Sequence, residues 1–184
     1  MKKIILLVLL SACTLISCND SVAQPSGERI SGQIYLYGEQ HGEEKIMNKE
    51  FELWREYYTN ENMRHLFIEL PYYTAEFLNL WMQSDSDTIL EEVYNDLAGT
   101  AMGVPHTKEF YKMFKKDCPK TIFHGTDVGH QYNSTGERYL KYLEANNLKD
   151  SGQYLLAKET IEQGKQYYGQ KGSIYHLCQL QQMY

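Results

Sequence analysis

The chain has 184 residues, 42% of them hydrophobic and 23% charged, a composition typical of one globular domain that excludes a disordered or fibrous chain. Eighteen Lys and Arg residues against 24 Asp and Glu residues give a formal net charge of −6. This acidic balance argues against nucleic acid and against an anionic membrane surface as partners.

Residues 1–17 are predicted to be a signal peptide. Two lysines precede an apolar run over residues 4–10, which is too short to span a bilayer. Residues 15–18, Leu-Ile-Ser-Cys, resemble the lipobox of bacterial lipoproteins, in which the cysteine is lipidated after cleavage. The resemblance implies an extracytoplasmic protein of the bacterial cell envelope, held to the membrane by a lipid on Cys18.

Two other cleavage patterns fit the same segment: a lipobox ending at Cys13, and a plain secretory peptide cut near Ala23. Residues 18–32 are rich in small and polar side chains and are predicted to be a flexible tether. Beyond the tether, export would permit a disulfide between Cys118 and Cys178, but no local cysteine pattern indicates one.

Residues 34–37, Ile-Tyr-Leu-Tyr, are predicted to be a short buried strand, since they are β-branched, aromatic or aliphatic and glycines follow at once. The turn after this strand carries Glu39 and His41 between Gly38 and Gly42. In open α/β sheets, ligands bind outside the carboxyl ends of the strands. We therefore expect Glu39 and His41 to be site residues.

The next segments complete a predicted strand, helix and strand. Apolar residues recur at helical spacing over residues 43–58, and residues 65–70 are a second apolar run, which ends at Glu69 and Pro71. Consecutive strands joined by a helix form a parallel, right-handed unit. Glu69 is therefore expected at the same edge of the sheet as Glu39 and His41.

Three further helices are predicted. One covers residues 75–84, one begins at a capping box formed by Thr88 and Glu91, and one begins at the capping residue Thr107. A third strand, residues 121–124, then opens into a second glycine-flanked polar turn. This turn carries two further candidate site residues, Asp127 and His130.

The remainder of the chain is predicted to be helical. Ser134 and Glu137 fit a helix cap, and a helical pattern from residue 150 is interrupted by glycines over residues 169–173. No further strand follows. Residues 33–184 are thus expected to form one α/β domain with a small, mainly parallel sheet, flanking helices and a helical C-terminal part that is truncated relative to its relatives.

Five candidate catalytic residues follow the predicted strands: Glu39, His41, Glu69, Asp127 and His130. A histidine can take a proton from water or from a hydroxyl, and a nearby carboxylate fixes its tautomer. Carboxylates with histidine can equally hold a divalent metal ion that generates a hydroxide nucleophile, and Glu39, His41 and Glu69 are the candidate ligands. No Gly-x-Ser-x-Gly elbow is present, so acyl-serine chemistry has no support.

Three motifs in order resemble one superfamily: residues 38–41, Gly-Glu-Gln-His; Ile-Glu at residues 68–69 before Pro71; and residues 125–131, Gly-x-Asp-x-x-His-Gln. They are similar to the superfamily of erythromycin esterases, ChaN-like haem-uptake lipoproteins and Tiki/TraB proteins. The resemblance implies a hydrolase in which His41 activates water, Glu39 orients it, and Glu69 is a second acid or a metal ligand.

The Glu-Gln-His spacing is closest to the ChaN-like and Tiki pattern, and the Arg-acid helix motif and the late Gly-x-x-His of esterase relatives are missing after residue 145. Three hypotheses follow: a lipid-anchored hydrolase acting on an ester or amide of a small molecule or peptide, a haem-binding iron-uptake lipoprotein, and a degenerate member without activity. The remaining histidines of the expected sheet and helices, His65, His106 and His124, are predicted to be surface or hydrogen-bonded residues.

Overall fold

The computed structural model describes the backbone of residues 34–181 and the side chains of residues 34–168. The predicted signal peptide, Cys18, the predicted tether and the side chain of Cys178 lie outside this part, whereas Cys118 is a buried free thiol. The chain divides into two units, residues 1–36 and residues 37–184. In the first unit, the described residues 34–36 have no regular secondary structure.

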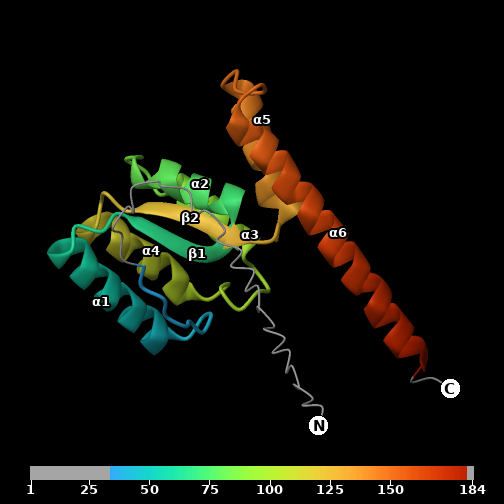
Figure 1. Cartoon of the computed structure of the whole chain (residues 1–184), viewed down its shortest axis with the longest axis horizontal. Coiled ribbons are helices and arrows are strands. Elements are labelled where there is room, and N and C mark those ends of the chain that lie inside the picture. Colours follow the sequence, from blue (N-terminus) through green and yellow to red (C-terminus); the bar gives the residue numbers. More distant parts are fainter. Residues whose placement is uncertain (1–33, 182–184) are drawn as a thin grey trace, which may run out of the picture. The chain divides into compact units, whose positions relative to one another are not determined.

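All helices and strands of the described residues belong to the second unit (Figure 1). In chain order they are α1 (Glu44–Asn60), β1 (His65–Pro71), α2 (Tyr72–Met82), α3 (Thr88–Asp96), α4 (Pro105–Asp117), β2 (Ile122–Asp127), the π-helical turn η1 (Tyr132–Gly136), α5 (Glu137–Ala145) and α6 (Gly152–Gln181). None of the described helices combines the length and the apolar character that crossing a membrane would need.

The sheet consists of β1 and β2, which run parallel with His65 opposite Ile122 and Phe67 opposite His124. The α/β class, the parallel pairing, the flanking helices and the helical C-terminal part are confirmed. The predicted strand over residues 34–37 is wrong: residues 34–40 form no strand, and Ile34 and Leu36 are 86% and 92% exposed. Strand propensity depends on burial against neighbouring strands, which these side chains do not have.

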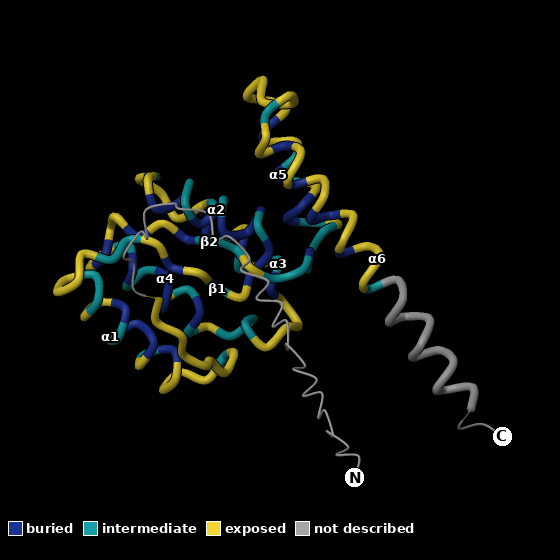
Figure 2. The backbone as a smooth tube through the Cα atoms, in the orientation of Figure 1, coloured by how far each residue is buried: buried dark blue, intermediate teal, exposed yellow. Residues whose placement is uncertain are grey.

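One face of the sheet is covered by α1 and α4. Phe123 of β2 packs edge-on against Phe114 of α4 with ring centroids 5.4 Å apart, and Phe114 in turn packs on Phe51 of α1 at 5.1 Å. The indole Nε1–H of Trp54 donates to Thr121 Oγ1 at 2.9 Å, which satisfies both buried groups. Figure 2 shows the buried stretches of these helices and of both strands.

The outer edge of β2 is covered by α2. The side-chain amide of Asn79 accepts from the Phe123 N–H at 2.8 Å and donates to the Phe123 carbonyl at 2.9 Å. A strand edge exposes unpaired backbone groups, and Asn79 satisfies two of them as a neighbouring strand would. A sheet of two strands is therefore completed on this side by a helix.

The predicted capping residues have other roles. Glu91 binds the Lys108 ammonium at 2.9 Å, the Thr107 hydroxyl donates to the Met102 carbonyl at 2.7 Å, and Ser134 lies inside η1, which continues directly into α5. The predicted break over residues 169–173 is also wrong, because α6 runs without interruption to Gln181. Capping signals are local, and at Glu91 a tertiary contact with Lys108 overrides the predicted cap.

Candidate functional site

Glu39 and His41 lie on the irregular segment that leads into α1, where a tight turn sets the direction of the chain. The Glu43 N–H donates to the Gln40 carbonyl at 3.3 Å, and Gly42 has a φ of +71°. A Cβ at Gly42 would overlap the carbonyl oxygen of Ala101, in the loop between α3 and α4. Glycine is therefore required here both for its backbone conformation and for close packing.

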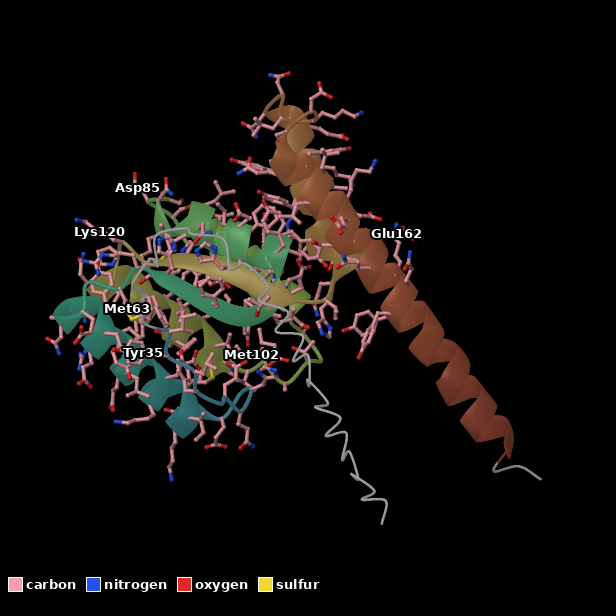
Figure 3. All side chains as sticks on the ribbon, viewed as in Figure 1. Tyr35, Met63, Asp85, Met102, Lys120 and Glu162 are labelled. Carbon is pink, nitrogen blue, oxygen red and sulfur yellow. The ribbon has the colours of Figure 1, made fainter. Side chains whose placement is uncertain are left out.

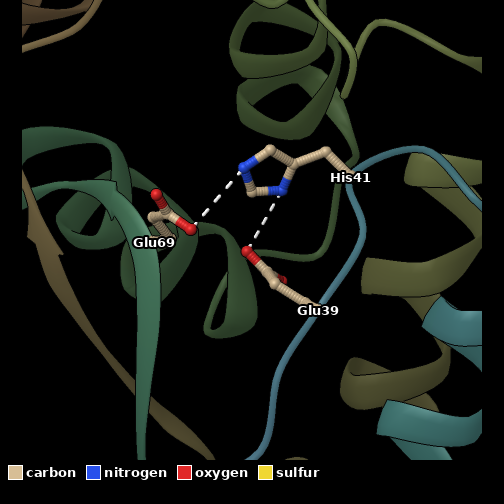
Figure 4. A group of neighbouring side chains, drawn as sticks. All are labelled: Glu39, His41 and Glu69. Carbon is tan, nitrogen blue, oxygen red and sulfur yellow. Dashed lines mark ion pairs between the residues drawn. The ribbon is translucent and has the colours of Figure 1, made fainter.

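Glu69 comes from the carboxyl-terminal half of β1, and its carboxylate points toward the His41 ring (Figure 4). His41 Nδ1 is 3.1 Å from Glu39 Oε1, and His41 Nε2 is 3.6 Å from Glu69 Oε2. One ligand atom from each of the three residues lies within 4.8 Å of the others. We call Glu39, His41 and Glu69 the histidine–carboxylate group.

The contacts of His41 decide what this group can do. An Nδ1–H donated to Glu39 fixes one tautomer of the neutral ring and leaves a lone pair on Nε2. That lone pair faces the Glu69 carboxylate, which is also an acceptor when ionised. A proton donor or a cation between Nε2 and Glu69 resolves this conflict, so the geometry suits a bound water or a metal ion.

Burial raises the pKa of the Glu39 carboxyl, the neighbouring His41 opposes the change, and the charge of Glu69 adds to it. Behind Glu39 lies Glu50 of α1, which is only 6% exposed and accepts a hydrogen bond from the Tyr37 hydroxyl at 3.3 Å. Burial raises the pKa of Glu50 to about 7, and the Glu39 charge contributes. A negative charge on Glu39 therefore disfavours a second one on the buried Glu50.

A small pocket opens at the histidine–carboxylate group, with about 20 Å³ of room for water-sized molecules, enough for about one water. Its wall combines these three residues and Glu50 with apolar side chains of α1, β1, α4 and the loop before α4. Met102 of that loop is labelled in Figure 3. A substrate of any size must therefore lie at the open mouth of the pocket and present only its reacting group to His41.

Asp127 and His130 do not belong to the histidine–carboxylate group. They form a pair of their own after β2, with His130 Nε2 2.8 Å from Asp127 Oδ2. The Tyr168 hydroxyl of α6 contacts the His130 ring, and the Tyr73 hydroxyl donates to the His130 carbonyl. Of the five predicted catalytic residues, the structure thus brings three together and places two in a second cluster against α6.

Sequence reasoning did not identify Glu50. The signal was present, since Glu50 lies on the apolar stripe of α1 between Met47, Phe51 and Trp54, where a charged residue needs a partner. The other histidines with described side chains are hydrogen-bonded as predicted: His106 Nε2 is 3.1 Å from Asn48 Oδ1, and His65 and His124 contact each other.

Comparison of the chain with family models, with curated proteins and with solved structures found no match in any of the three. The fold and the site define a small α/β domain with a histidine held between two carboxylates at the end of a parallel strand. Membership of the erythromycin esterase, ChaN-like and Tiki/TraB superfamily stays a prediction from the three sequence motifs.

Proposed function

We propose that the protein is a lipid-anchored hydrolase of the bacterial cell envelope, acting outside the cytoplasm on an ester or amide of a small molecule or peptide. The observation that carries the proposal is the position of His41, with Nδ1 3.1 Å from Glu39 and Nε2 3.6 Å from Glu69, beside a pocket with room for about one water. The lipobox at Cys18 supports the anchor, and the motif resemblance supports the hydrolase.

In this reaction, Nε2 of His41 takes a proton from the water as the water oxygen attacks the substrate carbonyl carbon. Glu39 holds the Nδ1–H and stabilises the imidazolium that forms. The imidazolium then returns its proton to the leaving oxygen or nitrogen, which breaks the acyl bond. Glu69, 3.6 Å from Nε2, accepts the second hydrogen of the attacking water and so directs its lone pair toward the carbonyl.

The same three side chains fit a divalent metal ion, since one nitrogen and two carboxylate oxygens within 4.8 Å make a three-ligand set with open positions. Glu39, His41 and Glu69 would hold the ion, which would supply a water of lowered pKa and polarise the substrate carbonyl.

The test is hydrolysis of a panel of esters and peptides by the purified protein, with and without Mn²⁺ or Zn²⁺. His41→Ala should lower the kcat/KM of any activity found by about 10²–10⁴. His106→Ala is the matched control, because this histidine is also hydrogen-bonded and partly buried but lies outside the histidine–carboxylate group. Activity retained in His41→Ala would overturn the proposal.

Haem binding and a non-catalytic role are the competing functions. Addition of haem to the same preparation separates them: a Soret band at one haem per chain together with no hydrolysis on the whole panel favours the iron-uptake function. Neither a Soret band nor hydrolysis favours the degenerate member. Hydrolysis lost in His41→Ala and a featureless haem titration favour the hydrolase.

A further inference from the structure

The sheet face opposite α1 and α4 carries three aromatic rings and one aliphatic side chain that no described element covers. His65 and Phe67 of β1 and Ile122 and His124 of β2 alternate with the buried residues of the two strands. Phe67 is 67% exposed and Ile122 is 42% exposed. Faces of parallel sheets are normally covered, so this open face is unusual and its side chains are accessible from solvent.

The parallel register makes the two histidines diagonal neighbours. His65 lies opposite Ile122, and His124 lies opposite Phe67, two residues further along. The result is a contact between the imidazoles, with His65 Nδ1 2.8 Å from His124 Nε2. Because both side chains stand on hydrogen-bonded strands, the backbone sets their spacing.

The His124 ring is held from both sides. It meets the edge of the His65 ring, with the ring centroids 5.1 Å apart and the planes at 29°. It stacks on the Phe67 ring, with the centroids 4.8 Å apart and the planes at 22°. Among the described residues, neither histidine forms an ion pair with a carboxylate, in contrast to His41 and His130. Two imidazoles at a spacing set by the strands thus share one hydrogen bond and have no acidic partner.

We propose that His65 and His124 form a second, independent metal site, a two-imidazole site for a divalent late transition metal, with Cu²⁺ the best fit. Two nitrogens about 2.0 Å from a metal and at a right angle to each other are about 2.8 Å apart, which matches the observed separation and the tetragonal preference of Cu²⁺. A tetrahedral ion would need about 3.3 Å between them.

Binding replaces the shared proton between the rings. The proton leaves to solvent. The two ring nitrogens point at each other along the hydrogen bond, so each ring turns by roughly 45° before both lone pairs meet at the ion at a right angle. Two or more positions of the ion stay open to water or to another donor. The ion also ties β1 to β2 across their register.

This site is separate from the histidine–carboxylate group. Glu69 is four residues beyond His65 on β1, which is about 13 Å along a strand. The two sites also differ in chemistry, because carboxylate oxygens suit harder cations and paired imidazoles suit Cu²⁺ and Ni²⁺. The proposal therefore does not rest on the proposed hydrolase.

The test is a Cu²⁺ titration followed by electron paramagnetic resonance. The full chain is used with its thiols alkylated, in a His41→Ala/Glu69→Gln background that disables the first group. One equivalent of Cu²⁺ should give a tetragonal spectrum with coupling to two nitrogens. His65→Gln and His124→Gln should each remove one nitrogen and weaken Cu²⁺ binding at least tenfold.

The matched control is His106→Gln, which should leave the spectrum and the affinity unchanged. Both substitutions in the pair are on an exposed sheet face, so circular dichroism should stay that of the parent. The proposal is overturned if the parent spectrum shows no nitrogen coupling, or if the His65→Gln/His124→Gln double variant binds the first equivalent of Cu²⁺ as tightly as the parent does.

Discussion

The turn that delivers His41 depends on Gly42, and replacement by alanine tests this dependence. Gly42 has a φ of +71°, and an added Cβ would overlap the Ala101 carbonyl oxygen. The left-handed conformation costs a non-glycine residue about 1–2 kcal/mol, and forcing extra atoms into a packed site costs about 1–3 kcal/mol. Gly42→Ala should therefore lower the free energy of unfolding by about 2–5 kcal/mol, a large part of the 5–15 kcal/mol typical of a domain.

Two other glycines separate the cost of the left-handed conformation from the cost of the overlap with an added Cβ. Gly99 has a φ of +81° but open space around its Cα, so Gly99→Ala should lose only the conformational part, about 1 kcal/mol. Gly38 has neither a positive φ nor a neighbour within 4 Å of an added Cβ, so Gly38→Ala should change stability by less than about 0.5 kcal/mol.

Urea unfolding followed by circular dichroism measures all three variants. With a dependence on urea of about 2 kcal/mol per molar, Gly42→Ala should lower the midpoint by about 1–2.5 M. A midpoint for Gly42→Ala within error of that for Gly38→Ala would refute the reasoning, because the turn would then tolerate a side chain and would not fix the position of His41.

Three further variants test the fold and the charges near the site. Burial raises the pKa of Glu50 from 4.5 to about 7, so the wild type should lose up to about 3 kcal/mol of stability as pH rises from about 5 to 8, a loss absent from Glu50→Gln in urea unfolding at both pH values. Thr121→Val leaves the buried Trp54 N–H without an acceptor and should cost about 1–3 kcal/mol in the same assay, whereas an unchanged midpoint would show that water replaces the hydroxyl. Asn79→Ala leaves the Phe123 backbone groups unpaired and should speed amide hydrogen exchange in β2, with exchange as in the wild type as the contrary result.

The candidate site was largely predictable although one of its supporting elements was not. Glu39, His41 and Glu69 were assigned to one sheet edge from an expected strand over residues 34–37, and the three side chains do meet. They meet because the turn at Gly42 and the end of β1 face each other, without that strand. Glycine and polar residues after an apolar run indicate a turn, but they do not tell whether the run itself pairs with a strand.

What could not be predicted depends on contacts distant in sequence. Asp127 and His130 follow β2 as expected, but their position is set by α6, whose Tyr168 contacts the His130 ring. Gly129 and Gly164 allow the close approach of this loop to α6, since a Cβ on either would overlap backbone of the other segment. No local sequence pattern indicates a contact between residues about 35 apart. The sequence alone therefore could not predict that Asp127 and His130 form a separate cluster.

The most direct test of the central claim is a double-mutant cycle on the first substrate that the wild type hydrolyses. If Glu39 acts only by orienting His41, then His41→Ala should lower kcat/KM by about 10²–10⁴, and adding Glu39→Gln to that variant should cause no further loss. Losses of the two single variants that multiply in the double variant would contradict the account, because Glu39 would then act on the reaction independently of His41.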